Sequence, residues 1–112
     1  MISLSNEYPR ESELEQIKNW DYKLGFKSLF EFIEGIWHIP DWGFRIYRTT
    51  DHLWDKKVTG VELHTRGWSG NEDIIYALQQ NFLFWSQCFH RQKRGGHYWF
   101  QISKELWTGK WE

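Results

Sequence analysis

The spacing of apolar residues changes at Pro40, and this change limits the fold more than any other feature of the chain. Before Pro40, apolar residues recur at helical spacing, which predicts one helix that ends near Gly25 and a second that starts at Ser28. After Pro40, apolar and polar residues alternate over 42–48 and 59–65. This alternation predicts two strands that pair as a hairpin with a long polar loop.

Three serines are each followed three residues later by glutamate, the capping-box pattern of a helix N-terminus. The pairs are Ser12 with Glu15, Ser28 with Glu31, and Ser69 with Glu72. The third pair predicts a helix over 70–80 that ends at Asn81.

The apolar run 82–90 fits either a strand or an extension of that third helix. We favour a strand, because Asn81 can end the helix and the run leads into a hairpin signal at 93–96. A last strand is expected over 97–102, and the aromatic tail 107–111 should pack back on the body. The whole pattern predicts a single α+β domain over residues 1–112, with a small mixed or antiparallel four-stranded sheet and about three helices in the order α-α-β-β-α-β-β.

Composition excludes several classes of protein. With 26% charged and 40% hydrophobic residues, the chain resembles neither disordered nor membrane proteins. The formal net charge of −1 argues against a broad basic face that coats nucleic acid, and equally against an acidic DNA mimic. Cys88 is the only cysteine and no spacing suggests zinc, so we expect no cofactor and no metal. Without a signal-peptide pattern or a long apolar run, the expected location is the cytoplasm, with no membrane partner.

Aromatic residues make up 20% of the chain, including nine Trp. Each buried ring removes a large apolar area from water, so a small core becomes stable with few residues. We expect most rings to be buried in this way. A minority could be exposed, either to stack on a base or to form a homo-oligomer interface.

Chain direction predicts where a binding site should lie. If a helix returns along the sheet between strands 59–65 and 82–90, these two strands run in the same direction. The loop 66–71 and the hairpin 91–96 then lie at the same end of the sheet. The start of strand 42–48 lies there too, because that strand is antiparallel to 59–65.

The residues at this end predict an anion-binding site made of backbone amides, guanidinium groups and an imidazole, with indole rings available for stacking. Ser69 and Glu72 would serve first as helix caps, and the glycines of the hairpin would serve its turn. The candidate ligand-binding residues are Trp42, Arg66, Trp68, Ser69, Asn71, Glu72, Arg91, Arg94 and His97.

The chain contains the segments Thr65-Arg66-Gly67-Trp68-Ser69-Gly70-Asn71-Glu72 and Arg94-Gly95-Gly96-His97-Tyr98. These segments resemble the motifs of a group of small bacteriophage-encoded proteins, which carry a Thr-Gly-Gly-Trp-Ser-Gly-Asn-Glu stretch and a closing Arg-Gly-Gly-His-Tyr. Arg66 stands where that pattern usually has glycine. The resemblance covers about the last half of the chain. It implies a phage protein in the host cell cytoplasm and points to the two loops, without implying a reaction.

These observations predict a phage accessory protein that captures a phosphorylated small molecule or a host protein without turnover, for example to counter host defence. One alternative is a phosphoester hydrolase or nuclease, in which Glu72 or His97 is the general base and Arg94 stabilises developing charge. Another alternative is a nucleic-acid-binding protein that uses the basic hairpin and exposed Trp. A homo-oligomer is compatible with each of them.

Overall fold

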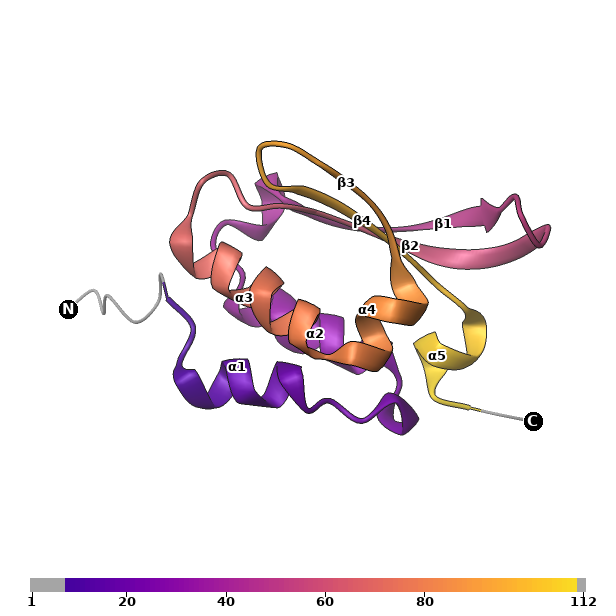
Figure 1. Ribbon diagram of the computed structural model, residues 1–112, viewed down its shortest axis with the longest axis horizontal. Coiled ribbons are helices and arrows are strands. Elements are labelled where there is room, and N and C mark those ends of the chain that lie inside the picture. Colours follow the sequence, from indigo (N-terminus) through magenta and orange to yellow (C-terminus); the bar gives the residue numbers. More distant parts are fainter. Residues whose placement is uncertain (1–7, 111–112) are drawn as a thin grey trace.

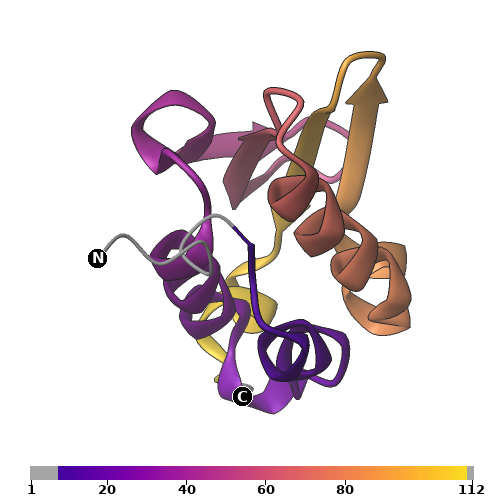
Figure 2. The ribbon, with the colours of Figure 1, turned by 90° about the vertical axis from the view of Figure 1, so that its left-hand side faces the viewer.

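The structure, a computed structural model, describes residues 8–110 and has two layers (Figure 1). One layer is a four-stranded sheet, and the α-helices lie together on one of its faces (Figures 1 and 2). Within the described residues, no helix has the length and apolar character needed to cross a membrane. The elements are α1 (Glu11–Lys18), η2 (Tyr22–Leu24), α2 (Phe26–Ile36), η3 (Pro40–Trp42), β1 (Phe44–Asp51), β2 (Lys56–His64), α3 (Ser69–Gln80), α4 (Phe82–Cys88), β3 (Phe89–Lys93), β4 (His97–Ile102) and α5 (Lys104–Thr108).

The sheet has the strand order β1-β2-β4-β3, and every neighbouring pair is antiparallel. This confirms the predicted α+β class with a four-stranded sheet, and the predicted elements occur in the predicted order. Two further α-helices, α4 and α5, are present besides the three that the sequence predicted.

The prediction of a strand over 82–90 was wrong for most of that segment. Residues Phe82–Cys88 form α4, and β3 begins only at Phe89. Asn81 does end α3, but its side-chain oxygen accepts a hydrogen bond from the Phe84 amide at 3.2 Å, which starts a new helix at once. Phe84 and Cys88 are both buried at helical spacing, so the apolar run covers the core as a helix.

None of the three capping boxes forms where the sequence pattern placed it. Helix α1 begins before Ser12, and the Glu13 carboxylate accepts from the Arg10 amide at 2.7 Å. Ser28 lies inside the first turn of α2, where its hydroxyl donates to the Gly25 carbonyl at 2.9 Å. Ser69 is the first residue of α3 and not its cap. Each helix therefore begins one to three residues before the position that the pattern indicated.

The core between the layers is mostly aromatic. The rings of Phe30, Phe84 and Phe100 pack against one another with centroid distances of 5.2 to 6.4 Å. Trp107 stacks on Phe30 at 6.3 Å, so the chain after β4 does pack back on the body, while Trp111 lies outside the described residues. The predicted burial of most rings holds for this core, but several large rings at the ends of the molecule are exposed.

Candidate functional site

Three segments distant in sequence meet at one end of the sheet. The Thr65 amide donates to the Gly96 carbonyl at 2.9 Å, which joins the corner after β2 to the β3–β4 turn. On the other side, the His64 amide donates to the Gly43 carbonyl at 2.9 Å. The predicted convergence is therefore present. It arises because β2 and β3 are both antiparallel to β4 and so run in the same direction, with β4 between them.

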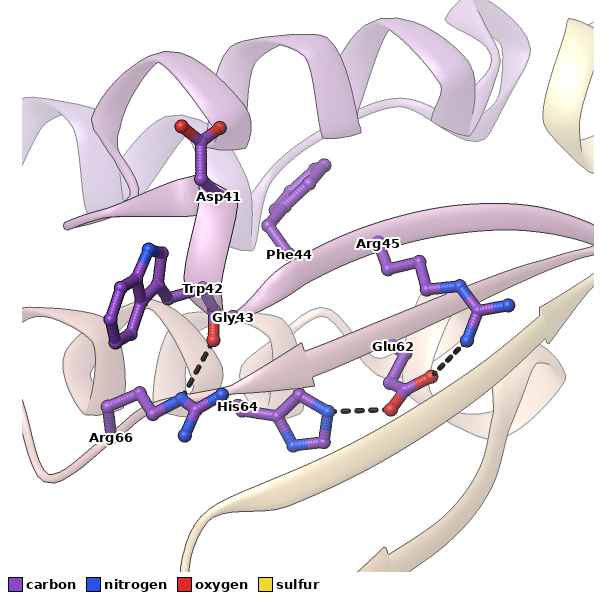
Figure 3. Close-up of a pocket in the computed structure, with 8 residues that line it drawn as sticks. All are labelled: Asp41, Trp42, Gly43, Phe44, Arg45, Glu62, His64 and Arg66. Carbon is purple, nitrogen blue, oxygen red and sulfur yellow. Dashed lines mark hydrogen bonds and ion pairs between the residues drawn. The ribbon is translucent and has the colours of Figure 1, made fainter.

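A pocket of about 360 Å³ opens at this end, and Figure 3 shows its lining. The Trp42 side chain forms one wall and is 69% exposed. The Arg66 guanidinium lies beside it, because its Nε donates to the Trp42 carbonyl at 2.7 Å. The lining residues are Asp41, Trp42, Gly43, Phe44, Arg45, Glu62, His64 and Arg66.

The floor of the pocket is a chain of polar side chains on neighbouring strands. Arg45 Nη1 lies 3.4 Å from Glu62 Oε1, and Glu62 Oε2 lies 2.6 Å from His64 Nε2 (Figure 3). His64 Nδ1 in turn lies 2.6 Å from Nδ1 of His97. Cross-strand register produces this chain, since Arg45 is opposite Glu62 and His64 is opposite His97.

The contacts of the chain fit one set of histidine tautomers. An ionised Glu62 accepts only from a protonated His64 Nε2, so a neutral His64 accepts at Nδ1 from the Nδ1–H of His97. Nε2 of His97 then carries a lone pair. The two histidines and the carboxylate therefore form a hydrogen-bonded relay from Nε2 of His97 to Glu62.

Of the nine candidate residues, Trp42 and Arg66 line the pocket, and His97 adjoins it through His64. Arg66 has a φ of 56°, in the left-handed region that glycine adopts without strain. This conformation turns the chain after β2 and directs the Arg66 side chain back towards Trp42.

Trp68 and Asn71 lie against the segment that leads into η3. The Trp68 ring is 3.9 Å from that of His38 between centroids. Asn71 is buried, and its amide accepts from the His38 amide at 2.8 Å and donates to the His38 carbonyl at 3.2 Å. These contacts give Asn71 a structural role, because they hold the approach to η3 against α3.

The remaining four candidates do not line the pocket. Ser69 is exposed at the start of α3, and Glu72 approaches the Thr65 hydroxyl at 3.5 Å. Burial, together with the Glu72 charge, raises the pKa of Tyr98. Arg94 is exposed in the β3–β4 turn. Arg91 lies over the Trp99 ring, on the outer face of the sheet.

Sequence reasoning missed Glu62, His64 and Arg45. Alternation does place Glu62 and His64 on one face of β2, and this signal was available. The partner strands and their register, which bring Arg45 and His97 to these side chains, are set only by the folded sheet.

A second pocket of about 300 Å³ lies between α1 and α3 and contains none of the candidate residues. Three carboxylates and one lysine border it, so it does not suit an anion. Its lining residues are Glu11, Leu14, Glu15, Lys18, Asp73, Tyr76, Ala77 and Gln80. Nowhere in residues 8–110 are three His, Cys, Asp or Glu side chains placed to hold a metal ion.

No protein-family model, curated protein or solved structure matches this chain. The likeness to phage-encoded proteins therefore stays a prediction that rests on the two sequence motifs, and the function must be argued from the site itself.

Proposed function

We propose that the protein binds a phosphorylated small molecule, such as a nucleotide, in the Trp42 pocket and does not turn it over. The observation that carries this proposal is the pairing of an exposed indole with a fixed guanidinium in one pocket. Within residues 8–110 the Arg66 guanidinium is held through Nε, so its terminal nitrogens can make a bidentate contact with a phosphate. The Trp42 ring offers a face on which a base can stack.

The size of the pocket supports this ligand, and its lining contains two arginines, Arg45 and Arg66, against two carboxylates, Asp41 and Glu62. Its volume of about 360 Å³ lies within the usual range for small-molecule sites. The Glu62 carboxylate is already paired with Arg45 and His64, so it repels a phosphate less than a free carboxylate would. The likeness to phage proteins alone extends the proposal to an accessory role in the host cytoplasm, such as sequestering a nucleotide signal of host defence. A host protein is the alternative occupant.

Substitution of either wall residue should weaken binding in isothermal titration against a panel of nucleotides. Trp42→Ala and Arg66→Ala should each raise Kd by about tenfold or more, since stacking on a base and a charge-assisted phosphate contact are each worth ~1–3 kcal/mol. The matched control is Trp54→Ala, because Trp54 is also 69% exposed but lies in the β1–β2 turn, away from the pocket.

The titration has two outcomes that contradict the proposal. Absence of heat with every nucleotide would remove the small-molecule ligand. An equal loss of affinity in Trp54→Ala and Trp42→Ala would show that any exposed indole contributes and that the pocket does not. Thermal unfolding of each variant checks that the fold is kept.

The proton chain favours acid–base catalysis as a second candidate function. For the phosphoester hydrolase or nuclease proposed from the sequence, Nε2 of His97 would take the proton of the attacking water, and His64 and Glu62 would hold the charge. Glu72 lies on the other side of this arrangement, beside Thr65, and is not part of the chain.

For this second candidate, His97→Ala should abolish hydrolysis of an activated phosphodiester and leave the unfolding temperature nearly unchanged. Loss of a general base typically lowers the rate by about 10²–10⁴-fold. His90→Ala is the control, since His90 is an exposed histidine on the neighbouring strand β3. Absence of hydrolysis in the wild-type protein, or equal rates in both variants, would exclude this function.

A further inference from the structure

Charge is separated between the two layers of the molecule, although the chain as a whole is nearly neutral. The strands contain six basic residues and two acidic ones, namely Arg45, Arg48, Lys56, Lys57, Arg91 and Lys93 against Asp51 and Glu62. The α-helices contain three basic residues and eight acidic ones, namely Lys18, Lys27 and Lys104 against Glu11, Glu13, Glu15, Glu31, Glu34, Glu72, Asp73 and Glu105. The sheet layer is therefore positive and the helical layer negative.

No α-helix of the described residues covers the outer face of the sheet (Figures 1 and 2). Four of the six basic strand residues lie on this face, Arg45, Lys56, Arg91 and Lys93, together with Asp51 and Glu62. The register places side chains of all four strands in rows across this face. One row runs Arg45, Glu62, Trp99, Arg91, and the next continues from His64 through His97 to Lys93.

Two arginines on this face lie over aromatic rings. Arg91 Cζ is 4.1 Å from the centre of the Trp99 ring, and Arg45 Cζ is 4.7 Å from that of Tyr47. Tyr47 itself lies flat on the sheet, because Gly60 opposite it has no side chain, and a Cβ there would overlap the ring. The face thus presents flat guanidinium and aromatic groups.

We propose that this outer face binds a single strand of nucleic acid, with one nucleotide in the Trp42 pocket. The inference rests on the proposed function of that pocket, which is continuous with the face because Arg45, Glu62 and His64 belong to both. Guanidinium planes and aromatic rings are the groups on which unpaired bases stack, and the surrounding cations neutralise phosphates.

The shape of the face selects a single strand over a duplex. Bases within a duplex are stacked on one another and cannot reach rings that lie flat on a sheet. Four strands about 4.8 Å apart span roughly 14 Å, which suits two or three unstacked bases. The face carries four basic side chains against two acidic ones, and this excess of positive charge complements a phosphate backbone and favours nucleic acid as the occupant.

The test compares binding of mononucleotides with binding of fluorescein-labelled oligo(dT) and oligo(U) of about ten nucleotides, followed by fluorescence anisotropy. The oligonucleotides should bind at least about tenfold more tightly than the mononucleotide. A plot of the logarithm of the oligonucleotide association constant against the logarithm of the salt concentration should have a slope of about −1.4 to −2.1, as expected for contacts with two or three phosphates. The comparison of oligo(dT) with oligo(U) shows whether DNA or RNA is bound more tightly.

A pair of matched double variants assigns the binding to one face. R91E/K93E reverses two charges on the outer face, and R48E/K57E makes the same change of charge on exposed positions of the opposite face. R91E/K93E should weaken oligonucleotide binding by about tenfold or more and leave mononucleotide binding in the Trp42 pocket unchanged. R48E/K57E should change the affinity for either ligand by about twofold at most.

Each other result overturns the inference. If mononucleotides bind and oligonucleotides bind no better, the proposed function stands and the outer face is not a site for nucleic acid. If neither binds, both proposals fail. Equal losses of oligonucleotide affinity in the two double variants would show that net charge alone attracts the oligonucleotide. The same conclusion would follow if poly-glutamate displaced the labelled oligonucleotide as well as an unlabelled one does. A dimer in light scattering that R91E/K93E dissociates would assign the face to a second copy of this chain.

Discussion

Asn81→Ala should lower the free energy of unfolding by about 3 kcal/mol, because three backbone groups lose a buried hydrogen-bond partner. The Asn81 amide donates to the carbonyl of Ile17 at 3.0 Å and to that of Trp20 at 3.3 Å. Its oxygen accepts from the Phe84 amide at 3.2 Å. One side chain therefore joins the end of α1 to the junction of α3 and α4, and alanine cannot replace any of these contacts.

Urea unfolding followed by circular dichroism measures this loss, with Asn19→Ala as the matched control. The Asn19 side chain also donates to a backbone carbonyl, that of Glu15 at 3.0 Å, but this contact is exposed to solvent. Asn19→Ala should therefore cost no more than about 0.5 kcal/mol. Similar values for the two variants would mean that the Asn81 network contributes little, and that α4 is not held in place by its cap.

The same residue explains the main error of the sequence prediction. Apolar periodicity was enough to predict the fold class, the first hairpin and the last strand, since each has a regular spacing over many residues. A short apolar run such as 82–90 has no spacing that separates helix from strand. What decides the matter is the Asn81 side chain, which caps α4 while it is held by Ile17 at a separation of 64 residues. No local pattern contains that contact.

The predicted convergence of three segments at one end of the sheet is present, but the candidate residues did not include Arg45, Glu62 and His64, which line the pocket there. This convergence depends only on the direction of the strands. Both β2 and β3 are antiparallel to β4, so they run in the same direction although they are not paired with each other. The proton chain depends on which residues lie opposite each other, and the sequence does not fix that register. The outer face was missed for a different reason. A net charge of −1 is the sum of a positive sheet and a negative helical layer, and a sum does not show how charge is distributed.

Gly96→Ala should lower the free energy of unfolding by about 3 kcal/mol and disrupt the end of the sheet where the pocket lies. Gly96 has a φ of 84°, which costs an L-residue about 1–2 kcal/mol. A Cβ at this position would also overlap the hydroxyl of Thr65, a buried side chain, and such overpacking costs a further ~1–3 kcal/mol. The substitution therefore forces apart the two corners that the Thr65 amide and the Gly96 carbonyl join.

Gly67→Ala separates the two causes, because Gly67 has a similar φ of 76° but open space where its Cβ would lie. It should lose only the conformational part, about 1–2 kcal/mol. Thr65→Ala should rescue part of the loss in Gly96→Ala, since it removes the overlapping hydroxyl, and a double-mutant cycle measures this coupling in urea unfolding. Equal losses at the two glycines, with no coupling to Thr65, would mean that the corners do not touch. A site that spans the end of β2 and the β3–β4 turn would then have no structural basis, because its two halves would be free to move independently.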